Sequence, residues 1–363
     1  MVSIVVPVYN EAENLPKLVK AIRASLNEVE HEIVIVDDNS PDGTGELADK
    51  LAKEDGDIRV IHRERKLGVA SAIAEGVREA KGEVVGTLNA DMLQAPDLLP
   101  AMLGQIDEHD IVIASRYVAG GHSEKGFWRR LVSKGAITIA RILLPRIRSV
   151  KDPISGFFLF RREVIAEAQL SSQSLSGNVS IGVKLLPELL VKGCHNSVIE
   201  VPYTDEKRQA GESKFALRDY FIYLGYVLHL MRTSGEFKRI VKFGLVGGSG
   251  MGVNEGLLFL LTDKVGLPYL LSAAFSWETA ILSMFTLHEF WTFRDSRKSG
   301  ASNILKRALK FNTIRLISLA MNITILYCLT EFLGLYYLVS ALIAIMIVFI
   351  WNYLASLNLI WRK

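Results

Sequence analysis

The 363-residue sequence has only two cysteines, Cys194 and Cys328, and no CxxC pair. A disulfide framework and a cysteine-based zinc site are therefore excluded, and a reducing compartment is favoured. A strong excess of basic residues is also lacking, because the formal net charge is only +3. Nucleic acid is therefore not an expected partner. Charged residues make up 22% of the chain and hydrophobic ones 50%, a balance that excludes wholesale disorder.

Several familiar motifs of nucleotide and acyl chemistry are missing as well. No GxGxxG follows the first predicted strand, and no GxxxxGK[ST] occurs, so neither a Rossmann dinucleotide site nor a P-loop is expected. Neither a Ser-His-Asp pattern nor a pair of histidines at metal-ligand spacing is found. The first apolar run, residues 4–8, is too short for the core of a secretory signal and is interpreted as a buried strand.

Short apolar runs rich in β-branched residues recur in the first 235 residues. They cover residues 4–8, 33–36, 58–61, 84–88 and 111–114. Helical patterns lie between them; in the first, Leu15, Leu18 and Ile22 share one face. Strands that alternate with helices predict an α/β domain with a mostly parallel sheet, whose strands are buried on both sides.

Polar residues follow four of these predicted strands, where parallel sheets bind their ligands. They are Tyr9 and Glu11, residues 37–42, residues 89–91 and residues 115–117. Asp37 or Asp42 alone would suit an ordinary turn, but four polar strand ends together favour a binding edge. Asp91 directly follows an apolar strand. A carboxylate there suits Mg²⁺ or Mn²⁺, because such cations take one or two carboxylates together with phosphate oxygens.

The last third of the chain is apolar and predicts an all-α membrane domain. Four stretches, about 240–262, 267–290, 309–333 and 336–361, approach or exceed the roughly 20 residues that cross a bilayer. Apart from polar residues gathered at their ends, the charges that interrupt them are Glu255, Glu278 and Arg315. The link between the second and third stretches is basic, with Arg294, Arg297, Lys298, Lys306, Arg307 and Lys310. Basic short loops stay in the cytoplasm, so the N-terminal domain and the C-terminus are predicted to be cytoplasmic.

Two further segments have the pattern of helices that lie in the membrane surface. One begins at Phe127-Trp128, and the other covers Tyr220 to Met231. Arg129 and Ser133 are four residues apart in the first, so they face the same way. Together with Arg116 they form a candidate site for a lipid phosphate, although general attraction to anionic headgroups is the alternative.

The strand-end residues carry a resemblance to a known family. Residues 5–11 (VVPVYNE), 36–44 (VDDNSPDGT), 89–91 (NAD) and 115–117 (SRY) resemble inverting glycosyltransferases of family 2, with the GT-A fold. Residues 151–158 (KDPISGFF) and 211–214 (GESK) resemble those of dolichol-phosphate mannose synthases and related polyprenyl-phosphate glycosyltransferases. This similarity covers about residues 1–235. The remainder resembles the four-helix GtrA-like domain that is fused to some members.

The resemblance implies a fold, domain limits and an activity. It implies a GT-A domain, with a Rossmann-like mixed and mostly parallel sheet, over 1–215. An interfacial helix over 216–235 and a GtrA-like membrane domain over 236–363 would follow. The activity would be transfer of mannose from GDP-mannose to dolichyl (polyprenyl) phosphate with inversion, at the cytoplasmic face. A UDP-sugar-dependent glucosyl- or N-acetylhexosaminyltransferase and a non-catalytic lipid-linked-sugar flippase remain alternatives.

The resemblance also implies residue roles. The nucleotide sugar would be held by Pro7, Tyr9, Glu11, Val36, Asp38, Asn89, Ala90, Asp91, Arg208 and Lys214. Of these, Asp91, Arg208 and Lys214 would act on the leaving diphosphate, and Arg116, Arg129 and Ser133 would bind the acceptor phosphate. Asp91 would be the principal ligand of Mg²⁺ or Mn²⁺. Asn89 is a weaker ligand, because it replaces the family's usual first acid, and Gln94 is a further candidate.

Overall fold

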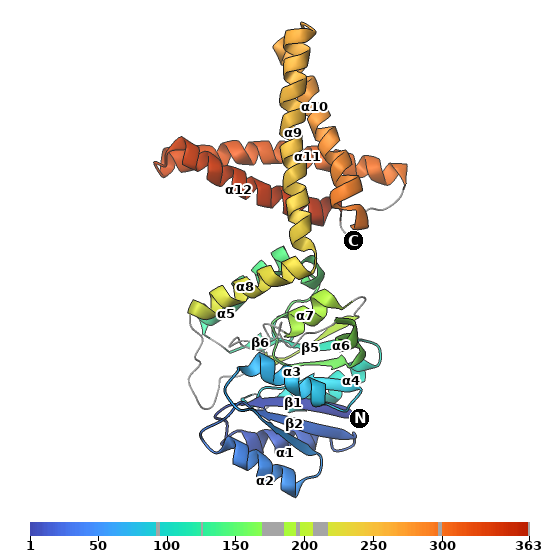
Figure 1. The fold of residues 1–363 in the computed structure, drawn as a ribbon, viewed down its shortest axis with the longest axis vertical. Helices are drawn as coiled ribbons and strands as arrows, with labels where there is room; N and C mark the ends of the chain where they lie inside the picture. The colour runs from blue at the N-terminus through green and yellow to red at the C-terminus, as the bar shows by residue number, and fades with distance from the viewer. Residues whose placement is uncertain are drawn as a thin grey trace. The chain divides into compact units, whose positions relative to one another are not determined.

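The structure is a computed structural model that describes residues 1–91, 95–124, 126–168, 185–193, 197–205, 217–296 and 300–361. The chain divides into two compact units, Met1–Ser234 and Gly235–Lys363. Figure 1 shows strands and helices in the first unit and helices alone in the second.

The first unit begins with alternating strands and helices. They are β1 (Val2–Val8), α1 (Leu15–Ser25), β2 (His31–Asp37), α2 (Thr44–Glu54), β3 (Ile58–His62), α3 (Val69–Glu79), β4 (Val84–Thr87), α4 (Leu99–Ile106) and β5 (Ile111–Ser115). The elements that follow are β6 (His122–Ser123), α5 (Phe127–Leu143), β7 (Phe158–Arg161), α6 (Glu163–Ala168), α7 (Leu185–Lys192), β8 (Val198–Pro202), β9 (Thr204–Asp205) and α8 (Leu217–Thr233).

The main sheet confirms the α/β prediction. Its strand order is β3-β2-β1-β4-β7-β5-β8, and every neighbouring pair is parallel except the two pairs that β7 makes. The predicted strands are all present, but β4 and β5 are not neighbours, because β7 lies between them. Since β7 runs antiparallel, the carboxyl ends of β1, β2, β4, β5 and β8 still meet at one edge of the sheet.

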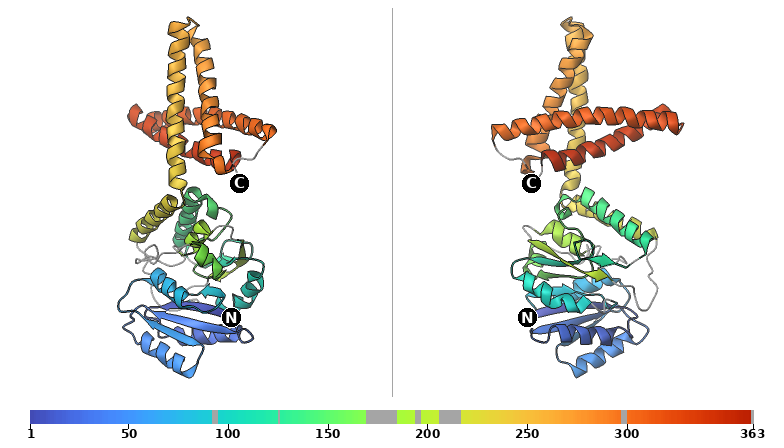
Figure 2. Two further views of the ribbon diagram at one scale, coloured as in Figure 1. Left: turned by 45° about the vertical axis from the view of Figure 1, so that its right-hand side comes forward. Right: turned by 180° about the vertical axis from the view of Figure 1, so that it is seen from behind.

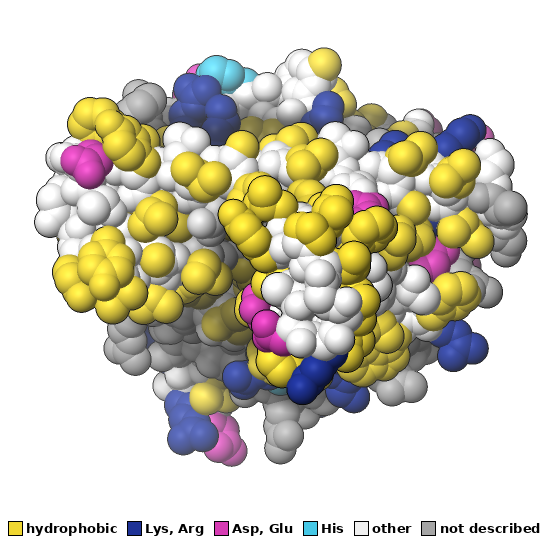
Figure 3. Space-filling view, turned by 90° about the horizontal axis from the view of Figure 1, so that it is seen from above, with side chains coloured by type: hydrophobic (Ala, Val, Ile, Leu, Met, Phe, Trp, Pro, Cys, Tyr) yellow, Lys and Arg dark blue, Asp and Glu magenta, His cyan; other side chains and the backbone are white. Residues whose placement is uncertain are grey.

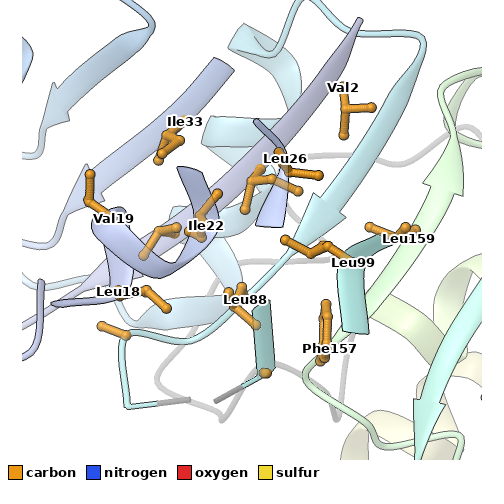
Figure 4. Packing of buried hydrophobic residues seen from close by; sticks show 14 of the residues in the cluster. Val2, Leu18, Val19, Ile22, Leu26, Ile33, Leu88, Leu99, Phe157 and Leu159 are labelled. Carbon is orange, nitrogen blue, oxygen red and sulfur yellow. The ribbon is translucent and has the colours of Figure 1, made fainter. Parts of the chain in front are cut away.

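The core of this unit follows from the apolar strands. All seven residues of β1 are buried. The amphipathic helix α1 packs against one face of the sheet, and Figure 4 shows its Leu18 and Ile22 near Leu88. The helix α3 covers the other face so closely that a Cβ atom on Gly76 would lie 2.4 Å from Cγ1 of Val5. Any larger residue at position 76 would push α3 off the sheet.

The second unit contains four long helices, each of which ends in a π-helical turn. They are α9 (Glu236–Phe259, then Leu260–Lys264), α10 (Tyr269–Leu287, then His288–Thr292), α11 (Ala301–Tyr327, then Cys328–Phe332) and α12 (Tyr337–Ala355, then Ser356–Ile360). By length and composition, all four are able to cross a membrane. The four predicted apolar stretches therefore correspond to four helices.

Within the second unit, α9 packs along α10, and α11 packs along α12. The two hairpins cross, as the views of Figures 1 and 2 agree. Aromatic residues from both hairpins, including Phe243, Phe293, Phe311 and Trp361, form the buried cluster that joins them. Most of the remaining surface is apolar and exposed, and Figure 3 shows hydrophobic side chains over the visible face with only scattered charges. Such a surface suits a lipid environment.

Candidate active site at the carboxyl ends of the strands

The edge of the sheet brings together residues that are far apart in the sequence. The strands β2, β1 and β4 are neighbours, and Pro7 of β1 pairs with Val36 of β2. Tyr9 and Glu11 follow β1, Asp38 follows β2, and Asn89 to Asp91 follow β4. The structure thus places eight of the ten residues predicted to hold the nucleotide sugar on three adjacent strand ends, while Arg208 and Lys214 lie outside the described residues.

Short polar side chains tie the first two of these strand ends together. The Asp37 carboxylate accepts a 2.5 Å hydrogen bond from the Ser40 hydroxyl, which in turn accepts one from the backbone N–H of Asn10. Asp42 accepts hydrogen bonds from the hydroxyl and backbone N–H of Thr44. Although burial works in the opposite direction, these bonds hold the pKa of Asp42 below its ordinary value. Asp37 and Asp42 therefore stabilise turns. Of the two roles considered from the sequence, an ordinary turn and a ligand-binding edge, this is the simpler one.

Asp38 is buried and is fully engaged with the loop that follows β3. Its carboxylate accepts hydrogen bonds from Arg63 Nη1 (2.8 Å) and from the backbone N–H groups of Leu67 (2.9 Å) and Gly68 (2.7 Å). The charge-assisted bonds to Asp38 fix the course of residues 63–68. In that loop, Lys66 Nζ lies 3.4 Å from the centroid of the Tyr9 ring. Asp38 therefore holds the loop that places the Lys66 ammonium against the Tyr9 ring at the edge of the sheet.

The third strand end holds the candidate metal ligands Asn89 and Asp91. Asn89 Oδ1 is buried and has no hydrogen-bond partner in the part of the chain that the structure describes. No cluster of three or more His, Cys, Asp or Glu suited to a metal occurs among the described residues. One carboxylate and one orphaned carbonyl oxygen fit a cation that takes its other ligands from a bound diphosphate and water.

Asn89 provides a direct test of this metal assignment. If Asn89 Oδ1 ligates the cation, Asn89→Asp adds a negative charge to the ligand set and should tighten Mn²⁺ binding roughly tenfold or more. The measurement is a Mn²⁺ titration followed by electron paramagnetic resonance in the presence of a nucleoside diphosphate. An unchanged affinity would place Asn89 outside the ligand set.

Residues 151–157 enter the site between β4 and β5, because they lead into the inserted strand β7. A Cβ atom on Gly156 would lie 3.1 Å from Asn89 Nδ2, so this glycine lets the backbone pass close to Asn89. The Thr87 hydroxyl donates a hydrogen bond to the Gly156 carbonyl. The tight packing fixes the Asn89 side chain from the side of β7.

Arg116, at the end of β5, forms a buried ion pair. Its Nε and Nη2 atoms lie 2.7 and 2.8 Å from the carboxylate oxygens of Asp152, and its Nη1 lies 3.6 Å from the carboxylate of Asp205 in β9. Asp152 is fully buried. Burial works to lower the pKa of Arg116, but the bonds and charges of Asp152 and Asp205 outweigh it and raise that pKa. The guanidinium predicted to bind the acceptor thus already holds three chain segments together.

The other predicted acceptor residues belong to α5. Ser133 hydrogen bonds to the phenol of Tyr117, the residue that follows Arg116. Burial raises the pKa of this phenol, while the Arg116 charge works to lower it. Arg116 and Ser133 therefore flank one tyrosine. The Arg129 side chain lies outside what the structure describes, as do Gln94, Arg208 and Lys214.

The helices α5 and α8 pack against each other within the first unit. The Tyr223 hydroxyl of α8 donates to the Ala136 carbonyl of α5, and the Tyr226 hydroxyl donates to the buried Glu188. Burial, reinforced by the Glu188 charge, raises the pKa of Tyr226. On their outer sides the helices leave four large apolar residues exposed: Leu131, Ile139, Leu224 and Leu228. The predicted interfacial segments thus form one helical pair with an apolar surface.

Sequence reasoning missed three residues of this edge. Arg63 anchors Asp38, and Asp152 and Asp205 hold Arg116. The KDPISGFF segment was an available signal for Asp152. No local signal identified Arg63 or Asp205, because their partners lie on other strands.

The mixed, mostly parallel sheet is of the GT-A type, and the family model that matches it makes this unit a glycosyltransferase domain. The family model "Glycosyl transferase family 2" matches residues 3–168, and "GtrA/DPMS, transmembrane domain" matches residues 242–361. A dolichol-phosphate mannosyltransferase of Pyrococcus furiosus is 40% identical over 362 residues, which cover 99% of each chain. The polyprenol monophosphomannose synthase of Mycolicibacterium smegmatis is 38% identical over 59% of this chain and 80% of that one.

This chain belongs to the dolichol-phosphate mannosyltransferase family, in the form that carries a GtrA/DPMS transmembrane domain. Among solved structures, it is similar to the glucosyl-3-phosphoglycerate synthase of Mycobacterium tuberculosis in complex with Mn²⁺, UDP-glucose and phosphoglyceric acid. That similarity has a TM-score of 0.48 at 18% identity and covers 64% of this chain and 79% of the other.

Proposed function

We propose that this protein transfers mannose from GDP-mannose to a dolichyl or other polyprenyl phosphate, with inversion at the sugar carbon. The full-length similarity to a dolichol-phosphate mannosyltransferase carries the proposal. The strand ends support it, because they gather the residues expected for a nucleotide sugar on β2, β1 and β4. The helical pair α5–α8 supports a lipid acceptor, since it exposes apolar residues beside Ser133.

The donor would lie over the ends of β1, β2 and β4. Pro7, Tyr9, Glu11, Val36 and Asp38 would form the nucleoside side, and Asn89, Ala90 and Asp91 the diphosphate side. When bound, Mg²⁺ or Mn²⁺ held by Asp91 and Asn89 would supply positive charge to the leaving diphosphate. Arg208 and Lys214 would neutralise the same diphosphate from the segment that follows β9.

The acceptor itself supplies the nucleophile. A phosphate monoester is ionised near neutral pH, so its oxygen needs no general base. Arg116, Arg129 and Ser133 would hold it beside the sugar. In-line attack by that oxygen breaks the bond between the sugar and the diphosphate, forms the new sugar–phosphate bond and inverts the sugar carbon. The chain's part is to hold two anions in this alignment.

We propose an orientation with the first unit and the C-terminus in the cytoplasm. The basic link between α10 and α11 supports it, because cytoplasmic loops carry the excess of Lys and Arg. The short links after α9 and α11 hold at most one basic residue each. In this orientation, the catalytic edge would meet nucleotide sugars on the side of the membrane where they occur.

Donor selection tests the proposal against a UDP-sugar enzyme and against a non-catalytic protein. GDP-mannose, UDP-glucose and UDP-N-acetylglucosamine would each be added with Mn²⁺ or with EDTA, and thermal unfolding would be followed. We expect the largest stabilisation with GDP-mannose and Mn²⁺, together with formation of a β-linked mannosyl lipid by nuclear magnetic resonance. Stabilisation by a UDP-sugar alone would show that the donor is a UDP-sugar and not GDP-mannose. Absence of any transfer would overturn the enzymatic proposal.

Arg129 and Arg130 form a matched pair for testing the acceptor site. Arg129→Ala removes a charge-assisted bond of about 1.5–3 kcal/mol, so kcat/KM for polyprenyl phosphate should fall roughly ten- to hundredfold. Arg130 lies one residue further on α5, about 100° around the helix, so Arg130→Ala should cost much less. Donor affinity should barely change in either variant. Equal losses in both variants would mean that Arg129 contributes only general attraction to anionic lipids and is not part of a specific acceptor site.

A further inference from the structure

The second unit contains an internal repeat of one helical hairpin. The pattern R-x-x-K-F begins at Arg239 and again at Arg307, and T-[DE]-x-x-G-L begins at Thr262 and again at Thr330. Both patterns recur at one constant spacing of 68 residues (330 − 262). The helix limits show the same spacing of 68 residues, because Tyr269–Leu287 of α10 matches Tyr337–Ala355 of α12, and the π-helical turns after them also match. The pair α9–α10 therefore corresponds to the pair α11–α12.

Matching residues of the two hairpins meet at the centre of this unit. Phe293 matches Trp361, and their rings stack with centroids 4.4 Å apart and an interplanar angle of 10°. Phe243 matches Phe311, and both are buried in the same cluster. The repeat thus builds a nearly symmetric aromatic centre from two copies of one hairpin.

Two polar residues break this symmetry. His288 stands where the second hairpin has Ser356, and Arg315 stands where the first has Gly247. The His288 ring lies 4.5 Å from the Phe243 centroid and 5.7 Å from that of Phe311. The Arg315 guanidinium lies 5.9 and 4.7 Å from the same two rings. Both side chains therefore lie on one pair of phenylalanines.

These two side chains hold donor atoms that no described group satisfies. Nε and Nη2 of Arg315 and Nε2 of His288 are buried without a hydrogen-bond partner in the described residues. The other His288 nitrogen, Nδ1, lies 3.1 Å from the Thr292 hydroxyl. Two buried carboxylates of this unit are already engaged: Glu289 is bound by Arg307 and by the Trp361 indole N–H, and Glu236 is bound by Arg239.

Among the described residues, no acidic side chain along the spans forms an ion pair with Arg315. Glu278 accepts a hydrogen bond from Asn312, and Glu255 accepts one from Asn254. An arginine without a counter-ion is costly inside an apolar unit, and contact with aromatic faces recovers only part of that cost. Charged groups at such positions are retained for a function, with a partner of opposite charge. Within the part of the chain that the structure describes, Arg315 therefore has no counter-ion.

We infer that Arg315 and His288 form a binding site for the phosphate group of a membrane lipid. A guanidinium presents paired donors that match phosphate oxygens, and His288 Nε2 adds a third donor when it carries a proton. The exposed side chains of Leu316 and Leu319, on the same helix as Arg315, offer apolar contact to the lipid chain. The site lies in the second unit and does not include Arg116, Arg129 or Ser133. It stands independently of the proposed transfer reaction.

The test measures binding without any sugar donor. The full-length protein in neutral detergent would be titrated with geranylgeranyl monophosphate, geranylgeraniol, phosphatidylglycerol and inorganic phosphate, and thermal unfolding would be recorded. Arg315→Gln would be compared with Lys306→Gln, which removes the same charge from an exposed position of the same helix. We expect a phosphate lipid to stabilise the wild type and the Lys306 variant, and to bind Arg315→Gln at least tenfold more weakly.

The individual arms identify the ligand. Stabilisation by geranylgeranyl monophosphate alone, retained in Arg129→Ala and lost in Arg315→Gln, assigns the site to an isoprenoid phosphate. An equal effect of phosphatidylglycerol with the same dependence on Arg315 assigns it to phospholipid. Arg315→Gln should also unfold at a higher temperature than the wild type without lipid, because an unpaired buried charge is gone. The site would be overturned if geranylgeranyl monophosphate and geranylgeraniol shift the unfolding temperature equally. It would also be overturned if a phosphate lipid shifts the wild type and Arg315→Gln equally. If Arg315→Gln does not fold, the wild type and Arg315→Lys are compared instead. The proposal is then overturned if no phosphate lipid raises the unfolding temperature of either protein.

Discussion

Asp91→Ala should abolish mannosyl transfer. Asp91 is the carboxylate proposed to hold the cation, so its loss leaves the departing diphosphate without its main positive charge. We expect kcat to fall at least roughly a hundredfold, or about 3 kcal/mol in barrier height. The measurement is transfer of radiolabelled mannose to a short-chain polyprenyl phosphate at saturating Mn²⁺.

A nearby carboxylate provides the control for this variant. Asp97 is exposed and lies six positions further along, after residues 92–94, so Asp97→Ala should retain nearly full activity. Asp91→Asn should remain inactive as well, since the amide preserves the shape and removes the charge. Normal transfer by Asp91→Ala would show that this carboxylate has no part in the reaction.

Asp152→Asn should strongly destabilise the first unit. Asp152 is fully buried, and its carboxylate binds both the guanidinium and the backbone N–H of Arg116. Removing the charge leaves Arg116 with the more distant Asp205 alone, and breaking a buried ion pair in this way costs about 3–5 kcal/mol. For a unit of this size, the unfolding midpoint should fall by roughly 10 °C, as followed by circular dichroism.

A double variant separates the structural role of Arg116 from its proposed role in acceptor binding. Arg116→Met combined with Asp152→Asn leaves no lone charge, and the asparagine oxygen still accepts the backbone N–H at position 116. We expect this double variant to recover most of the stability. Transfer should remain low if Arg116 binds the acceptor phosphate. Recovery of both stability and transfer would confine Arg116 to a structural role.

The strands and apolar helices could be predicted from the sequence because their signals are local. A β-branched run such as residues 111–114 lies wholly inside β5, and each apolar stretch of the last third lies on one long helix. The polar strand ends were recognisable for the same reason, since each directly follows its own strand. The candidate residues Asp38 and Asn89 thus needed no tertiary information to be singled out.

Sheet order was not accessible in this way. The antiparallel β7 enters between β4 and β5, and only then do residues 151–157 reach Asn89 on one side and Arg116 on the other. Strand pairing depends on contacts between distant segments, which no single stretch of sequence records. Sequence reasoning therefore treated the Lys151–Phe158 segment as a family signature and not as a bridge between two strand ends.

The sequence by itself determined the α/β class, the four apolar helices and the strand ends that carry polar residues, because periodicity and hydrophobicity act over short distances. Only the tertiary structure decided which of those residues acquire partners. Asp38 is bound by a loop that follows a different strand, and Arg116 is bound by two distant aspartates. Arg315 has no counter-ion among the described residues, although the sequence shows it only as one charge within an apolar stretch. The reason is that burial and ion pairing are properties of the packed chain, in which the free energy of a charge depends on what the fold places beside it.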